Sequence, residues 1–451
     1  MKFLAQPKGA RFTNKDMIIF LLPVFFETLM LAALSTADTF MVSTKLGTTA
    51  LAGVALVNRI DNFAKQFFIA FAQGGSVVMA QYIGAKDEVD ARKSLKSNIQ
   101  IVVGFGVIIM LMMIFLKKQF ITLFFGGAEA DVLAVSLKYF SVTAISYPFV
   151  ALYYTCTALF RVMGHTKLPF FSSIVMMGIN LGFKYIFIFT MDMGVTGAAL
   201  STLLAMAIVG FSLLFMLTLK RTRVRLTNVL NPEFDIKMAK RVLRISVPNG
   251  VEQAMFQLGA LMLAGLVSGL GEEAINADQV ARNLCAGVQI GTAFNVLMIT
   301  VVGQCLGAND VDEAIRYKKH ILKLDYLLSV IICVFYIMII KPMISIFNIS
   351  PQAETWAFQI LLLYVIGTAT FYPRSFATPS ALRGAGDTKF VMIVSIASMF
   401  LFRIGCAYFA VYVLDIGVLG IWVAMVSDWV IRTIAFEIRF KSGKWKEHHV
   451  I

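Results

Sequence analysis

The chain alternates between long apolar stretches and short polar segments. Twelve of the stretches reach the length of roughly 20 residues that a helix needs to cross a bilayer. They cover residues 17–44, 50–80, 93–116, 132–158, 168–190, 195–219, 240–270, 274–305, 317–340, 353–381, 390–413 and 418–438. The pattern predicts an all-α integral membrane protein with twelve transmembrane helices.

Short motifs of the first half recur in the second half at an offset of 222 to 225 residues. There are four matched motifs: Pro23 and Glu27 match Pro248 and Glu252; Gln81, Gly84, Ala85 and Asp87 match Gln304, Gly307, Ala308 and Asp310; Arg161, Gly164, Thr166 and Lys167 match Arg383, Gly386, Thr388 and Lys389; and Asp192, Gly194 and Gly197 match Asp415, Gly417 and Gly420. Six spans in each half give the halves the same orientation, so the repeat predicts two pseudo-symmetric six-helix bundles. The predicted domains are residues 1–219, a cytoplasmic linker at 220–239, and residues 240–451 with a basic tail.

Composition agrees with a membrane protein. Hydrophobic residues make up 59% of the chain and charged residues 15%, against about 25% charged in ordinary domains; the mean hydropathy is +0.79. The first apolar stretch is too long for a cleavable signal peptide and is expected to remain as the first span. The five cysteines are scattered without a CxxC spacing, which argues against a disulfide framework or a zinc site.

The net charge of +14 comes from basic residues between the apolar stretches. Most of them fall in the termini, the linker and alternate loops, and the positive-inside rule places that side in the cytoplasm. We therefore expect a multi-pass protein of the cytoplasmic (inner) membrane with both termini cytoplasmic. We expect no nucleic acid among its binding partners. The spans contain no His/Asp/Ser or metal-binding constellation, so we expect neither an enzyme nor a metal or organic cofactor.

The first span holds two acids, Glu27 and Asp38, eleven residues or about three turns apart on one helix face. An ionised carboxylate in a membrane helix costs several kcal/mol unless it has a partner or faces water. Glu252 repeats the position of Glu27 in the second half. The face that carries these acids is expected to turn towards a bundle interior or a solvated cavity.

Asp38 has a set of candidate neighbours at its own depth. Counting from the outer turns at 1.5 Å per residue places Asp38, Asn180, Lys184 and Thr202 in one layer about 12–18 Å below the outer surface. Spans one, five and six all belong to the first half, so a polar layer there is expected. An alternative stays open in which Asp38 pairs with Arg59 of the second span.

In these motifs the chain resembles the MATE (multidrug and toxic compound extrusion) transporters over nearly its whole length. Three motifs carry the resemblance. The first is Asp38 followed by a turn at Leu46 and Gly47 and then by Ala50, Leu51 and Ala52. The other two are the motif of Gln81, Gly84 and Ala85 and the run from Ala381 to Lys389. The resemblance implies two six-helix lobes, alternating access, and export of amphipathic compounds, often organic cations, against an inward flux of H⁺ or Na⁺.

Within the family the chain is similar to the DinF-like branch, whose first-helix acid and polar residues of helices five and six correspond to Asp38, Asn180 and Thr202. Where that pattern has a second acid, this chain has Lys184. An ammonium beside Asp38 would fill the space of a bound cation. Coupling is then expected to use protons rather than sodium, either at Asp38 with Lys184 or at Glu27 or Glu252.

A second function of the same superfamily is a lipid-linked precursor flippase. It requires a cationic central cavity, which Arg59, Arg282, Arg374 and Arg403 would have to form together. We expect small amphipathic substrates, a bilayer setting and a monomer.

Overall fold

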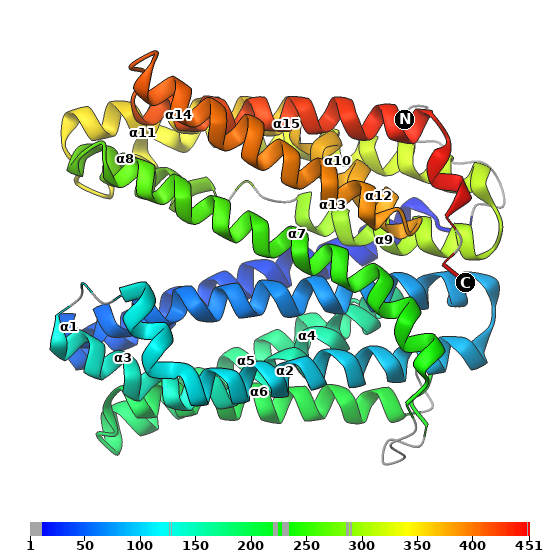
Figure 1. The fold of residues 1–451 in the computed structure, drawn as a ribbon, viewed down its shortest axis with the longest axis horizontal. Helices are drawn as coiled ribbons and strands as arrows, with labels where there is room; N and C mark the ends of the chain where they lie inside the picture. Colours follow the sequence, from blue (N-terminus) through cyan, green and yellow to red (C-terminus); the bar gives the residue numbers. More distant parts are fainter. Residues whose placement is uncertain are drawn as a thin grey trace. The chain divides into compact units, whose positions relative to one another are not determined.

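In the computed structural model the described residues are 11–125, 127, 129–219, 224–227, 234–285, 288, 291–448 and 450–451. Within them the regular secondary structure is entirely helical (Figure 1). The helices of the first half are α1 (Asn14–Ala85), α2 (Glu88–Phe125), α3 (Ala130–Thr143), η2 (Ala144–Ser146), α4 (Tyr147–Val162), α5 (Lys167–Tyr185), η3 (Ile186–Thr190) and α6 (Gly194–Thr218).

The second half has a corresponding set of helices. They are α7 (Ile236–Ser268), α8 (Glu272–Cys285), α9 (Gly291–Gly307), α10 (Val311–Ser345), α11 (Pro351–Thr370), α12 (Tyr372–Gly384), α13 (Thr388–Ala397), η5 (Ser398–Ile404), α14 (Gly405–Tyr412), α15 (Val418–Lys441) and η6 (Lys444–Glu447). Each predicted span falls on this helical framework, which confirms the all-helical membrane fold. Span 274–305 falls on α8 and α9, and residues 286, 287, 289 and 290 between them lie outside the described residues.

Several helices differ from the predicted spans in how they are divided. In the described residues nine helices are long and apolar enough to cross a membrane, or ten if the bent pair α11 and α12 is one span. One of them, α1, holds the first two predicted spans in 72 residues, with a break at Gly47 (φ 79°, ψ −176°). A glycine adopts this positive φ without the steric penalty that a Cβ imposes. The two spans therefore follow each other without an intervening loop.

The internal repeat is visible in the backbone. Positive φ angles occur at matched positions of the two halves, which are Gly47 and Gly271, Lys86 and Asn309, Gly164 and Gly386, Asp192 and Asp415, and Gly194 and Gly417. The aspartates of the first repeated loop also have the same role: Asp87 Oδ1 accepts a hydrogen bond from the Asp90 amide at 3.0 Å, and Asp310 Oδ1 accepts one from the Glu313 amide at 2.8 Å. Both carboxylates satisfy amides in the first turn of the following helix.

Two compact units can be distinguished, Phe12–Gly250 and Arg11 together with Val251–Ile451. Their boundary lies within α7, directly after the turn that contains Pro248. Of the predicted linker at 220–239, residues 220–223 and 228–233 lie outside the described residues. The predicted domain limits remain a prediction.

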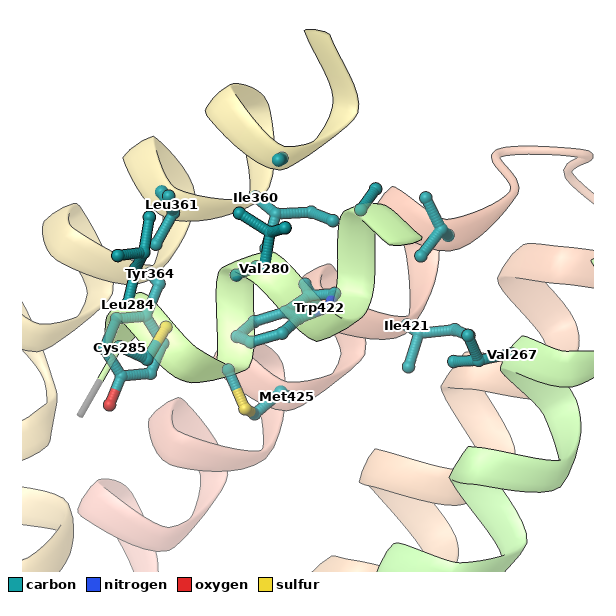
Figure 2. Close-up of a cluster of buried hydrophobic side chains, with 14 of the residues drawn as sticks. Val267, Val280, Leu284, Cys285, Ile360, Leu361, Tyr364, Ile421, Trp422 and Met425 are labelled. Atoms are coloured by element: carbon teal, nitrogen blue, oxygen red, sulfur yellow. The ribbon is translucent and has the colours of Figure 1, made fainter. Parts of the chain in front are cut away.

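Each unit has its own core, and Figure 2 shows part of the core in the second unit. There α8 supplies Val280, Leu284 and Cys285, and these pack against α11 and α15 around the ring of Trp422. The Tyr364 and Trp422 rings meet edge to face at 5.9 Å, a favoured aromatic geometry. Large apolar side chains also cover the outside of the helices, as expected of helices in lipid; Phe115 is 77% exposed and Met338 76%.

Close packing of α1 on α3 gives a stability prediction. A Cβ on Gly53 would lie 2.8 Å from Val135 Cγ1 and 3.1 Å from the Val132 carbonyl oxygen, whereas one on Gly104 meets nothing within 4 Å. We expect Gly53→Ala to lower the free energy of unfolding by about 1–3 kcal/mol, because overpacking displaces the backbone. The matched control Gly104→Ala is expected to raise it by up to about 1 kcal/mol through helix propensity. Sodium dodecyl sulfate titration of the purified variants measures both, and equal effects would contradict the packing argument.

Candidate functional site

The first feature of the site is an ion pair between α1 and α5. Lys184 Nζ lies 2.5 Å from Asp38 Oδ1, with the lysine side chain 2% exposed and the aspartate side chain 28% exposed. Lys184 stands in the last turn of α5, before the π-helical segment η3. Arg59, the alternative partner of Asp38, is exposed. The pairing of Asp38 with Arg59 is therefore wrong, and the buried cation that Asp38 meets is Lys184.

The two predicted polar neighbours form a second contact beside this pair. Asn180 Nδ2 donates to Thr202 Oγ1 at 3.1 Å, which joins α5 to α6. Thr202 Oγ1 donates in turn to the Ala198 carbonyl at 3.3 Å. Asn180 is buried, and its Oδ1 accepts no hydrogen bond within the described residues. A buried amide oxygen without a donor carries a desolvation cost of about 1–3 kcal/mol, so this group is available to a ligand or to water.

All four residues border one cavity of about 370 Å³ in the first unit. The structure thus brings Asp38, Asn180, Lys184 and Thr202 together, as the depth estimate expects. Helices α1, α3, α4, α5 and α6 all contribute to the wall. The volume lies within the range of small-molecule sites, about 300–1,000 Å³. The arrangement combines one buried ion pair with a wall of apolar side chains, hydroxyl groups and amide groups.

Sequence reasoning missed part of this wall. Asn58, Asn62 and Lys65 line the cavity from the second span of α1, and the hydroxyl-bearing rings of Tyr139 and Tyr154 line it from α3 and α4. The spacing of 58, 62 and 65 places three polar side chains on one helix face, a signal that the sequence contains. Nothing in the sequence singles out the two tyrosines, because their apolar rings suit any core.

The other two predicted acids lie in ion pairs of their own. Glu27 Oε2 is 2.8 Å from Arg161 Nη2. In the second unit both carboxylate oxygens of Glu252 contact Arg383 Nη2, at 2.7 and 2.8 Å. Both glutamates are buried. Each pair thus joins two of the repeated motifs, the Pro-x-x-x-Glu of one helix and the Arg-x-x-Gly of another.

Two of the four arginines considered for a flippase, Arg282 and Arg374, have local partners of their own. Arg282 Nε contacts Asp278 Oδ2 at 2.6 Å, one turn away on α8. The Arg374 guanidinium lies 5.2 Å from the centre of the Tyr326 ring. These contacts give the flippase alternative no support.

These features define a multi-pass helical membrane protein whose repeated halves hold buried ion pairs, one of them at a cavity within the spans. A family model described as MatE matches residues 23–186 and 248–409, and the chain belongs to this family. It is accordingly a transporter and not an enzyme. The resemblance to the MATE transporters is confirmed at the level of the family, and the DinF-like branch remains a prediction.

Curated relatives match along most of the chain. The probable multidrug resistance protein NorM of Thermotoga maritima is 27% identical over 445 residues, covering 97% of this chain and 94% of that protein. The uncharacterized transporter YisQ of Bacillus subtilis is 26% identical and covers 94% of this chain and 93% of that protein. The multidrug export protein MepA of Staphylococcus aureus is 22% identical over 295 residues, which are 63% of this chain and 64% of that protein.

Solved structures share the fold. A MATE structure in the bent conformation has a TM-score of 0.87 at 20% identity, covering 96% of both chains. A MOP superfamily transporter from Pyrococcus furiosus, described as having a binding pocket of reverse polarity, has a TM-score of 0.87 at 21% identity, covering 96% of this chain and 97% of that one. At these identities the likeness establishes the fold alone.

Proposed function

We propose that the protein is a secondary active antiporter that exports amphipathic compounds, the organic cations implied by the resemblance among them, in exchange for protons. Export is supported by relatives that are named for multidrug resistance and multidrug export. We further propose that it lies in the cytoplasmic (inner) membrane as a monomer with both termini cytoplasmic and without an organic cofactor. The basic residues of the termini, the linker and alternate loops support that orientation.

The observation that carries the choice of proton is the ion pair between Asp38 and Lys184. A sodium ion needs several oxygen ligands, and one carboxylate oxygen of Asp38 already contacts an ammonium at 2.5 Å. Protonation of Asp38 removes its charge and leaves the buried Lys184 without an anionic partner. A buried unpaired ammonium is unfavourable, so protonation favours a conformation in which Lys184 reaches water or another acceptor. Such differential stabilisation of two states is what couples an ion to transport.

Proteoliposomes with imposed gradients test the coupling ion. We expect a pH gradient to drive accumulation of an amphipathic fluorescent probe, and a sodium gradient at equal pH to drive none. Two probes are used, 11-(dansylamino)undecanoate and its trimethylammonium counterpart, so that the result does not depend on the charge of the cargo. Empty liposomes give the passive background. Accumulation driven by sodium alone would contradict the proton proposal.

A further inference from the structure

The charges that line the cavity of the first unit bear on the kind of compound it holds. Three of its lining residues have acidic or basic side chains of the types that ordinarily carry a charge at neutral pH, namely Asp38, Lys65 and Lys184. Among the lining side chains alone, two cations and one carboxylate leave an excess of one positive charge; the buried Asp61 carboxylate, one turn from Lys65, is not part of the lining. This excess is opposite in sign to what a site for organic cations needs.

The single carboxylate is not available to a cationic ligand. Asp38 is already neutralised by Lys184 at 2.5 Å, and that ammonium is almost fully buried. A ligand cation bound at Asp38 would have to displace Lys184 or lie beside it. Either arrangement leaves two positive groups close together in a medium of low dielectric, where like charges repel strongly.

Lys65, by contrast, carries the charge that is open to a ligand. It is half-buried, lines the cavity and makes no ion pair within the described part of the chain. The nearest acid on its own helix is Asp61, one turn earlier. Asp61 is 3% exposed and its Oδ1 accepts a hydrogen bond from the Tyr147 hydroxyl at 2.8 Å, and it does not line the cavity. A ligand in the cavity therefore meets the Lys65 ammonium and not the Asp61 carboxylate.

The rest of the wall suits an amphipathic anion. Asn58 and Asn62 stand on the same face of α1 as Lys65, and their amides supply donors for an oxyanion. Apolar side chains complete the wall and suit a hydrocarbon or aromatic body; they include Leu34, Val54, Met176 and Met206. Methionine adapts its shape to varied ligands.

We propose that this cavity binds amphipathic organic anions, with Lys65 as the residue that contacts the carboxylate or other acidic group. The proposal deepens the proposed function and rests on it for the transport of such a ligand. For this cavity, the proposal replaces the organic cations that the family resemblance implies with organic anions. Lys184 then has a separate role, because its charge is committed to Asp38.

Binding to purified protein in phosphatidylcholine nanodiscs tests the site without transport. We expect 11-(dansylamino)undecanoate to bind at least tenfold more tightly than its trimethylammonium counterpart, as read from dansyl fluorescence. Lys65→Gln should weaken binding of the carboxylate by about tenfold, the loss of one charge-assisted contact, and Lys65→Arg should retain most of it. Lys118→Gln is the matched control, since Lys118 is exposed on α2 and changes net charge equally; it should alter the affinity less than twofold.

Tighter binding of the cationic probe, equal effects of Lys65→Gln and Lys118→Gln, or no binding of the carboxylate would each overturn the proposal. Repeating the titration with phosphatidylglycerol in the nanodisc distinguishes two sources of the anion. Weaker binding of the carboxylate probe in the presence of phosphatidylglycerol would identify a lipid headgroup as the ligand. An unchanged affinity for the probe would identify a soluble compound, and both results agree with an anionic site. Proton-driven export of the cationic probe, together with no binding of the carboxylate, would overturn the anionic site while leaving the antiporter proposal intact. Binding of the carboxylate without export would do the reverse.

Discussion

Replacing Asp38 with asparagine is expected to abolish proton-coupled export and to lower the free energy of unfolding by about 3 kcal/mol, the cost of leaving a buried charge without its partner. The stranded group is Lys184, whose side chain is 2% exposed. Lys184→Met is expected to abolish coupling as well, because the ammonium that moves when Asp38 is protonated is gone. Proteoliposome export under a pH gradient and sodium dodecyl sulfate titration measure the two effects.

The double variant Asp38→Asn with Lys184→Met separates stability from coupling. It removes both charges, so we expect most of the stability to return while export stays uncoupled. The control pair is Lys45 with Asp192, which lie 3.7 Å apart with side chains 40% and 81% exposed. Lys45→Met and Asp192→Asn should each change stability by less than about 1 kcal/mol. Unchanged coupled export in Asp38→Asn would exclude Asp38 as the coupling acid.

The second large effect is expected at the repeated ion pairs of Glu27 with Arg161 and Glu252 with Arg383. Arg161→Met should lower the free energy of unfolding by about 3–4 kcal/mol, because it leaves the buried carboxylate of Glu27 unpaired. Arg383→Met should cost nearly the same, since Glu252 is buried in the matching position with a similar contact distance. The control is Arg92→Met. Arg92 pairs with Glu88 at 3.1 Å on the surface, with side chains 41% and 66% exposed, so less than about 1 kcal/mol is expected.

Two further variants, Glu27→Gln and Glu252→Gln, decide whether these glutamates take part in coupling. If each glutamate only holds two helices of one unit together, Glu27→Gln and Glu252→Gln will lower the free energy of unfolding. Export by the protein that remains folded will still depend on the pH gradient. The readout is export per folded molecule, with the folded fraction taken from size-exclusion chromatography. Normal stability with loss of proton dependence would instead assign coupling to Glu27 or Glu252.

Much of the fold follows from local properties of the sequence. Hydrophobic length identifies a membrane span because every backbone group in lipid must be paired within the helix, and the offset between Arg161 and Arg383 or Asp192 and Asp415 identifies the repeat directly. The depth of Asp38 relative to Lys184 also follows from the fixed rise of a helix. The pattern does not show that α1 continues through Gly47. In sequence, a single non-helical glycine within a helix looks the same as a short loop between two helices.

The partners of the buried charges depend on how the helices rotate and pack. Asp38 lies against Lys184 rather than Arg59, and Glu27 and Glu252 meet arginines of the repeated turns. Lipid is as apolar as leucine, so hydrophobicity does not specify which face of a membrane helix meets which neighbour.

The sequence by itself therefore determined the class of protein, its spans, its two repeated halves and the layer in which Asp38 lies, because these depend on residue type and spacing along the chain. Only the tertiary structure decided that Lys184 pairs with Asp38, that Asn58, Asn62 and Lys65 share a cavity with this pair, and that two of the three acidic or basic side chains lining that cavity are lysines. Those contacts join residues far apart in the chain, and side-chain packing between helices sets them.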